Sequence, residues 1–431
     1  MDPILVGFLA VVGLLVLIMS GVWIAVALAI VGLVTAYIFQ IGIQVALYIP
    51  WVSSTNFVLT ALPLFILMGN LLLHSGASEK IYQGASKILA WAPGGLLHSN
   101  IGACTLFAAI SGSSGATAAT IATVATPSLI KRHYDRKLLL GSLAGGGTLG
   151  VLIPPSINMI IYGAIAQVSV GRLFAGGILP GLVMSGMFMT YIGIRAVLNP
   201  RLAPKEKAFS WKDLPSSFLD LWPALVLMIV VMGGIFTGFA TPTEAAALGA
   251  SGALLIGLGQ RKLTWQNLWD SLMPSVITTC MVVFIFVGAN ILGSVLVLVG
   301  LAHSFANLIS SFAVPLVVTL LFVYLGYILL GCVMEPLSII VVTTPIMLPA
   351  LVALGVDPIW FGVVLVVLTE TAMLTPPVGP LLFIIQGVTD CDFGEVAIGS
   401  MPFFLILVIG LLLLTAFPNL VLWIPSLIFG S

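Results

Sequence analysis

Charge is the feature that this sequence most lacks. Only 6% of its 431 residues are charged, whereas 60% are hydrophobic. A water-soluble domain of this size could not keep that balance without aggregating, so the bilayer is the solvent of the chain. Apolar stretches long enough to cross about 30 Å of hydrocarbon as helices recur along the sequence, and the short alternating segments of an outer-membrane barrel are missing. We therefore predict an all-α polytopic membrane protein.

Cysteine is scarce as well, and it shows no pattern. The four cysteines lie in apolar segments without metal-ligand spacing, so neither a disulfide framework nor a zinc site is predicted; they are Cys104, Cys280, Cys332 and Cys391. The first apolar stretch, 3–19, lacks a basic leader and a small-residue cleavage site. We interpret it as the first membrane helix rather than a secretory signal.

Basic residues are confined to the middle of the chain. All fourteen Lys and Arg residues fall between Lys80 and Lys262, and most gather in clusters at 131–137, 195–212 and 261–262. The positive-inside rule places each cluster on the cytoplasmic side of the membrane. Counting spans from the polar linker at 199–217 then puts the amino terminus on the outer face.

The first half of the chain, 1–198, opens with scaffold segments. Apolar runs predict helices at about 4–18, 22–39 and 46–74. Segment 78–91 keeps Lys80 and Lys87 away from its apolar residues, a pattern typical of a helix lying along the membrane surface. We predict a surface arm there.

Two interrupted segments follow in this half. The arms of segment 98–131 are too short to span the membrane, and they meet at a Gly/Ser tip at 111–115. The next segment, 138–168, is broken at Pro154 and Pro155, because proline lacks the N–H that helix continuity needs. Unpaired backbone at membrane depth survives only around a polar cavity, so we predict a re-entrant hairpin followed by a broken helix.

The second half, 218–431, repeats this plan after the cytoplasmic linker 199–217. Further spans are predicted at about 219–240, 243–259 and 273–300, with a surface arm at 264–272, a hairpin at 315–353 and a broken helix at 358–388. The break Leu374–Gly379 carries a second proline pair at the same distance beyond its hairpin tip. Order, spacing and prolines all recur, and the topology makes the two copies inverted. Such inverted repeats place a binding site near the bilayer midplane.

Oxygen atoms dominate the predicted tips and breaks. Backbone carbonyls lose their helical partners there, and hydroxyls are added by Ser111, Ser113, Ser114, Ser156 and Thr375. A small hard cation such as Na⁺ suits these ligands. The helix amino termini just beyond the tips and breaks offer N–H groups and a positive dipole end to an anion. Cation and anion can therefore share one site.

Inserting an acidic residue at the centre of an apolar membrane helix costs about 2.5 to 3.5 kcal/mol on insertion scales. Such residues are therefore usually retained because they have a function. Glu335 at the second tip and Glu370 before the second break are such residues, and each has either a functional or a structural role. The same alternatives hold for Glu244, where helix capping after Thr241 suffices. Asp357 precedes Pro358 at a predicted helix start, where capping also explains it.

With these residues in place, the sequence resembles the large membrane (M) subunit of the tripartite ATP-independent periplasmic (TRAP) transporters over essentially its whole length. The motifs that carry the resemblance are Ser111–Ala118, Ile153–Ser156, Ala240–Ala246 and Thr375–Gly379. The resemblance implies a non-enzymatic elevator-type carrier in a bacterial inner membrane, with a periplasmic amino terminus. It also implies sodium symport of a small organic anion, such as a C4-dicarboxylate or sialic acid, and no nucleic-acid partner.

The resemblance further implies partners and site residues. A periplasmic substrate-binding (P) protein would deliver the anion, and the small membrane (Q) subunit is expected as a separate chain. By position, the first Na⁺ site would comprise Ser111, Ser113, Gly150 and Ile153; the second Gly331, Ala372, Thr375 and Val378; and the substrate site Ser114, Ser156 and Glu335. Ala372 stands where the family pattern leads us to expect glycine, which makes the second sodium site the less secure.

Other functions remain open at this stage. Gly112–Gly115 also reads as the G-x-S-G of rhomboid-type intramembrane proteases, but that serine needs a base. Neither His133 nor His303 is placed for hydrogen-bond reach, and we assign no catalytic role to any histidine, His74 and His98 included. A stand-alone dicarboxylate carrier and a passive anion channel are the remaining alternatives.

Overall fold

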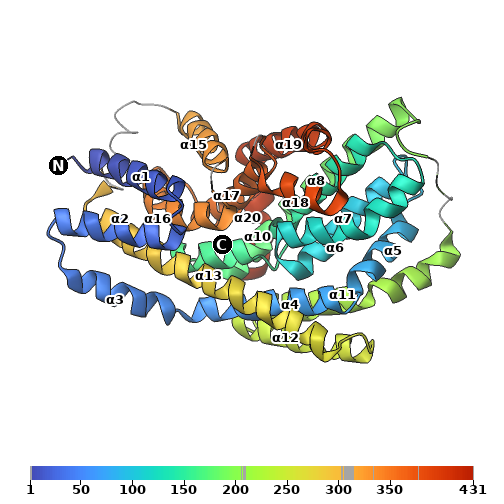
Figure 1. Cartoon of the computed structure of the whole chain (residues 1–431), viewed down its shortest axis with the longest axis horizontal. Helices are drawn as coiled ribbons and strands as arrows, with labels where there is room; N and C mark the ends of the chain where they lie inside the picture. Colours follow the sequence, from blue (N-terminus) through green and yellow to red (C-terminus); the bar gives the residue numbers. More distant parts are fainter. Residues whose placement is uncertain are drawn as a thin grey trace.

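The structure, a computed structural model, describes residues 2–204, 206, 210–301, 304, 315–332, 334–376 and 378–430. Every regular element in these residues is a helix, as predicted (Figure 1). Seven helical stretches among them are long and apolar enough to cross a membrane. His303 lies outside the described residues, as do Pro377 of the second break and Lys205 and Lys207 of the basic linker.

The third predicted scaffold helix, 46–74, is divided in the structure. After α1 (Pro3–Met19) and α2 (Ile24–Ile38) come α3 (Ile43–Ser54), a 3-10 turn η1 (Phe57–Thr60) and α4 (Ala61–His74). The single helix predicted at 46–74 is therefore wrong. Asn56 explains the break, because its side-chain oxygen accepts a hydrogen bond from Val58 N at 3.0 Å and restarts the backbone after α3.

The first hairpin and the first broken helix lie where the sequence places the interruptions. The elements are the arm α5 (Ala77–Leu89), then α6 (Leu96–Ser111), α7 (Ser114–Lys131), α8 (Arg136–Leu152), α9 (Ile157–Ala166) and α10 (Val170–Leu198). Gly112 ends α6 in the left-handed region at φ 59°, which glycine adopts freely. Ser113 and Ser156 then cap the amino termini of α7 and α9.

The second half shows the same helix–break–helix order. Its elements are η2 (Trp211–Asp213), α11 (Leu214–Phe236), α12 (Pro242–Gly259), α13 (Trp265–Leu298), α15 (Leu316–Leu330), α16 (Pro336–Ala353), α17 (Pro358–Met373), α18 (Pro380–Thr389), α19 (Phe393–Ala416) and α20 (Asn419–Phe429). The predicted surface arm at 264–272 is not separate from the span predicted at 273–300. That segment forms the first turns of α13, which continues through Pro274 without ending.

Equivalent helices of the two halves make reciprocal contacts. The second arm of the first hairpin, α7, packs against α18, and the second arm of the other hairpin, α16, packs against α9. Likewise α8 packs against α19, whereas α17 packs against α10. This exchange of partners is the contact pattern expected when two copies of one unit interlock.

One of these contacts joins the two halves backbone to backbone. A methyl group built on Gly141 of α8 would overlap the carbonyl oxygen of Gly399 in α19, and one built on Gly399 would overlap the carbonyl oxygen of Lys137. Small residues allow this closeness, which membrane helices commonly use for packing.

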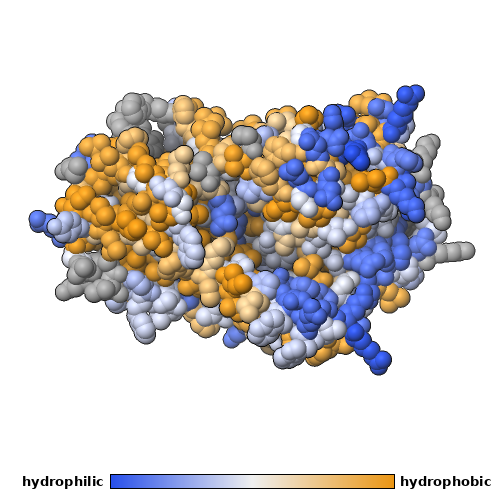
Figure 2. Space-filling model, viewed as in Figure 1, coloured by the Kyte–Doolittle hydropathy of each residue, from blue (hydrophilic) through white to orange (hydrophobic). Residues whose placement is uncertain are grey.

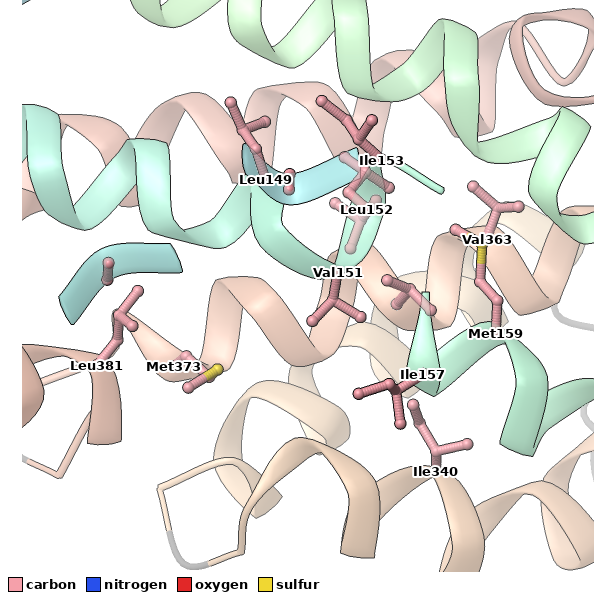
Figure 3. Close-up of a cluster of buried hydrophobic side chains, with 14 of the residues drawn as sticks. Leu149, Val151, Leu152, Ile153, Ile157, Met159, Ile340, Val363, Met373 and Leu381 are labelled. Carbon is pink, nitrogen blue, oxygen red and sulfur yellow. The ribbon is translucent and has the colours of Figure 1, made fainter. Parts of the chain in front are cut away.

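A hydrophobic cluster surrounds the first break. Figure 3 shows side chains from the break converging with side chains of α16, α17 and α18; those labelled are Leu149, Val151, Leu152, Ile153, Ile157, Met159, Ile340, Val363, Met373 and Leu381. All of them are buried. This cluster fixes the first break against the second hairpin and the second broken helix.

Candidate functional site

The first tip and the first break touch through their backbones. A Cβ atom built on Gly150 would lie 2.6 Å from the carbonyl oxygen of Ser113 and 2.7 Å from Thr117 Oγ1. A Cβ atom on Gly112 would lie 3.0 Å from the carbonyl oxygen of Pro155. Only residues without side chains permit these approaches, so the tip seats directly on the end of α8 and on the break.

Oxygen atoms gather at this contact. The hydroxyls of Ser111 and Thr117 lie 2.7 Å apart, and Ser111 Oγ lies 3.4 Å from the carbonyl oxygen of Ser113. Ser111, Ser113 and Gly150 are therefore brought together. Ile153 ends α8 one turn later, with its side chain in the hydrophobic cluster of Figure 3. Neutral oxygens in this arrangement suit a hard monovalent cation.

The second tip meets α17 in a similar way. A methyl group on Gly331 would overlap the Cβ atom of Ala372. Thr375 lies one turn beyond, where its Oγ1 donates to the carbonyl oxygen of Thr371 at 3.1 Å. Val378 is 45% exposed. Gly331 and Ala372 are thus in direct contact, and the other two predicted residues of this sodium site follow along the break.

A buried carboxylate links the first tip to the second broken helix. Ser114 Oγ donates to Glu370 Oε2 at 2.6 Å, although the two residues are 256 positions apart. Both are nearly inaccessible, with 2% and 1% exposure. Glu370 lies only two residues before Ala372, so the two hairpin tips contact the same end of α17.

The three predicted substrate residues make different local contacts. Ser156 is fully buried, and its Oγ accepts from Met159 N at 3.3 Å as the cap of α9. Glu335 is partly exposed at the start of α16, where Ser338 Oγ donates to it at 3.5 Å. Of the three, Ser114 alone is seen to bind a carboxylate, that of Glu370.

A cavity of about 160 Å³ lies beside the first tip. Its polar walls include Ser111 and Ser113 from the tip and two scaffold residues, Asn70 of α4 and Thr278 of α13. Asn70 Nδ2 donates to Ser275 Oγ at 2.8 Å. Neither scaffold residue was predicted from the sequence, and the signal that could have found Asn70 is a carboxamide within an apolar run.

Two further acidic residues named in the sequence, Glu244 and Asp357, serve as caps. Glu244 forms a capping box with Thr241, whose backbone N–H donates to Glu244 Oε2 at 2.8 Å. Asp357 accepts from Trp360 N at 2.8 Å. The structural alternative for Glu244 is therefore supported, and the capping interpretation of Asp357 is confirmed.

Histidines are held by local hydrogen bonds. His74 Nδ1 lies 2.9 Å from the carbonyl oxygen of Asn70 and 3.0 Å from Ser271 Oγ. His98 Nε2 lies 2.7 Å from the carbonyl oxygen of Pro93. Neither contact involves a tip serine.

The base of the first hairpin is tied to the linker outside the membrane-spanning segments. Glu206 accepts from Arg132 at 2.5 Å and from the Tyr134 hydroxyl at 3.0 Å. The same hydroxyl accepts from Leu96 N at 3.0 Å. Burial raises the pKa of Tyr134 above its ordinary value, so this hydroxyl keeps its proton at physiological pH.

The motifs at the tips and breaks belong to a known family. Residues 11–420 match the family described as the tripartite ATP-independent periplasmic transporter, DctM component. This chain belongs to the DctM family. The resemblance inferred from the sequence is thereby confirmed.

Individual relatives in the DctM family align with this chain over most of their own length. The chain is 34% identical to the C4-dicarboxylate TRAP transporter large permease protein DctM of Pseudomonas aeruginosa, over 87% of each chain. It is 32% identical to the isethionate TRAP transporter permease protein DctMQ of Oleidesulfovibrio alaskensis, covering 96% of this chain and 65% of the relative. The chain thus spans less than two thirds of that relative.

A solved structure shows the same fold. The YdaH transporter of Alcanivorax borkumensis superposes with a TM-score of 0.60 at 14% identity, over 85% of this chain and 86% of the other. Family membership makes this DctM-family chain a multi-pass membrane transport protein and not an enzyme. The protease alternative is therefore set aside, and the tip serine at position 114 has a carboxylate partner rather than a base.

Proposed function

We propose that this DctM-family chain is the large subunit of a sodium symporter that imports a small organic anion by an elevator mechanism. The observation that carries the proposal is the meeting of both hairpin tips at one end of α17, through the Ser114–Glu370 hydrogen bond and the Gly331–Ala372 contact. Broken helices and tips that converge inside the protein create a site for ions and anions together.

Sodium is proposed at two places. The first site comprises Ser111, Ser113, Gly150 and Ile153, and the second Gly331, Ala372, Thr375 and Val378. Support for the first is the contact between Gly150 and the Ser113 carbonyl; support for the second is the contact between Gly331 and Ala372. Every proposed ligand is a carbonyl or hydroxyl oxygen, the kind of ligand that a small hard cation prefers.

The anion is proposed to bind at the first tip. Ser114 stands at the amino terminus of α7, where the helix dipole favours negative charge, and its hydroxyl already donates to a carboxylate. Ser156 and Glu335 would complete the site after the tips rearrange around bound ions. Relatives at 32% and 34% identity are named for isethionate and for C4-dicarboxylate, so the proposal is a small organic acid, with sialic acid also within the class.

Movement would be driven by the membrane potential and the sodium gradient. The hairpins and broken helices would slide against a scaffold that includes α2, α4 and α11 to α13. Each net positive charge carried inward gains about 2.3 kcal/mol per 100 mV, so symported sodium can drive anion accumulation when cations outnumber the anion's charges.

The surface supports an orientation in the membrane. Figure 2 shows hydrophilic residues gathered at the right-hand end, over the region of α5 to α8 and α11, whereas the opposite end is largely hydrophobic. The amino terminus lies at that opposite end in Figure 1. We propose that the hydrophilic end faces the cytoplasm and the amino terminus faces the periplasm, across a bacterial inner membrane.

Two protein partners complete the proposal. A periplasmic binding protein would deliver the anion, and a small membrane subunit would accompany the chain as a separate polypeptide. Co-purification of a small subunit with the tagged chain tests the second point. Uptake by the chain alone would instead favour a stand-alone dicarboxylate carrier.

Reconstitution tests the transport function. The chain, its small subunit and the binding protein are placed in proteoliposomes, and uptake of radiolabelled C4-dicarboxylates, isethionate or sialic acid is followed with an inward sodium or choline gradient. We expect accumulation against a gradient with sodium alone. Equal uptake in choline, or equilibration without accumulation as in a passive channel, would contradict the proposal. Ser114→Ala should abolish uptake, whereas Ser426→Ala, at an exposed serine bonded only within α20, should not.

A further inference from the structure

Glu370 is the one acidic side chain that is buried among the described residues. It lies in α17, inside an apolar helix, with 1% exposure. Placing a carboxylate in such surroundings is expensive unless its charge is balanced nearby. In its charged form Glu370 therefore needs a cation close by, because it would otherwise take up a proton.

The described part of the chain does not supply the balancing charge. Glu370 Oε2 accepts the Ser114 hydroxyl, and Oε1 has no hydrogen-bond partner among the described residues. The ion pairs that the structure describes join Lys87 with Asp220, Arg132 with Glu206 and Arg136 with Glu395, all away from α17.

The basic side chains on helices that pack against α17 either have other partners or lie far from Glu370. Arg172 of α10 donates to the carbonyl oxygens of Phe429 and Gly430. Arg195, near the end of α10, is exposed and lies over the Tyr191 ring. Lys137 is exposed at the start of α8, opposite the end where Gly150 meets the tip. None of these basic side chains balances the charge of Glu370, so the balancing cation is inferred to be a bound ion.

Glu370 lies between the two proposed sodium sites. Its partner Ser114 directly follows Ser113, a proposed ligand of the first site. Two residues beyond Glu370 is Ala372, a proposed ligand of the second site and the residue that Gly331 touches. Both sites consist of uncharged oxygens, so neither has a formal negative charge of its own to hold a cation in a low-dielectric interior.

We propose that Glu370 is the shared counter-charge of the two sodium sites. Its carboxylate would attract the ion at each site without being one of the proposed ligands, and its bond to Ser114 keeps the charge against the first tip. The inference rests on the proposed sodium coupling and adds to it a positioning residue that the carbonyl and hydroxyl ligands alone do not provide. One charge serving two ions also makes their binding interdependent.

Glu370→Gln is the test, because glutamine keeps an oxygen to accept the Ser114 hydroxyl and loses only the charge. The purified complex of the chain with its small subunit is melted at increasing NaCl, with choline chloride holding ionic strength constant. We expect the sodium concentration for half-maximal stabilisation to rise at least tenfold. Glu395→Gln, a surface acid paired with Arg136, is the matched control and should leave that midpoint unchanged.

The outcomes separate the two proposals. A wild-type complex that sodium does not stabilise contradicts sodium coupling itself. A stabilised wild type with an unchanged Glu370→Gln midpoint overturns the counter-charge alone. Should Glu370→Gln not fold, Ser114→Ala decides, because it keeps the charge but removes the bond that holds the charge against the first tip; the sodium concentration for half-maximal stabilisation should rise, and an unchanged value overturns the inference.

Discussion

Replacing Gly150 by alanine should selectively weaken sodium binding. The added methyl would lie 2.6 Å from the Ser113 carbonyl oxygen, 2.7 Å from Thr117 Oγ1 and 2.8 Å from Ser114 Cα. Two of these three atoms belong to the backbone of the tip, which cannot rotate away as the end of a flexible side chain can. The tip must therefore move off α8, and with it the oxygens proposed to bind sodium.

The size of this effect follows from the cost of overpacking. Inserting a methyl group into a well-packed interior costs about 1 to 3 kcal/mol. If that strain falls mainly on the ion-bound conformation, the sodium affinity falls by a factor of about 5 to 150. Alanine is also intrinsically more stable than glycine within a helix by about 0.5 to 1 kcal/mol, and this gain partly offsets the strain in the variant.

Gly186→Ala provides the control for that intrinsic preference. Gly186 is also inside a helix, α10, but no heavy atom lies within 4 Å of a Cβ atom built on it. Sodium-dependent melting and sodium-dependent uptake of both variants are compared with the wild type. Gly186→Ala should need the same sodium concentration for half-maximal stabilisation as the wild type. A wild-type midpoint in Gly150→Ala, at normal expression, would refute the seating of the tip on α8 as a requirement for sodium binding.

Three further substitutions probe other contacts. Thr241→Ala removes the capping box with Glu244 and should lower stability by about 1 kcal/mol while transport continues; a loss of uptake at unchanged melting temperature would assign Glu244 a functional role. Tyr134→Phe removes the hydroxyl that donates to Glu206 and should lower the melting temperature, at a cost of about 1 to 3 kcal/mol, without shifting the sodium midpoint; a shifted midpoint would contradict this. Gly331→Ala should reduce the steepness of the sodium dependence, because its methyl would overlap α17; unchanged steepness would argue against a second ion there.

The helix interruptions could be predicted from the sequence because their causes are local. Gly112 takes a left-handed conformation that glycine adopts freely, and Pro154 and Pro155 cannot continue the hydrogen bonding of α8. Residue type alone therefore marks where these helices end. The same reasoning placed Thr241 and Asp357 at helix starts, where the structure shows both as caps.

Errors arose where the local signal was weak or was overridden. Asn56 divides the segment 46–74 with one side-chain hydrogen bond that hydropathy does not register. Segment 264–272 gives the opposite error, because it continues into α13 and passes through Pro274, even though proline usually interrupts helices. Neither residue differs in type from others that behave as expected, so only the packed structure distinguishes them.

Contacts between the halves could not be predicted from local patterns at all. Nothing in the sequence around Ser114 specifies that its hydroxyl donates to Glu370, 256 residues later. The cost of a buried acid marked Glu370 as unusual but left its role open. The partner emerged only once the tip, α8 and α17 were placed together.

The glycine contact between α8 and α19 limits how the molecule can move. With Gly141 and Gly399 in backbone contact, and the Phe403 ring of α19 packed against Gly141 and Gly145, neither helix can slide along the other without a clash. A large displacement must therefore carry both as a single rigid block, although they come from opposite halves of the chain. A sliding surface has to run between other elements, and the 160 Å³ cavity that separates the first tip from Asn70 and Thr278 leaves open space at one such boundary.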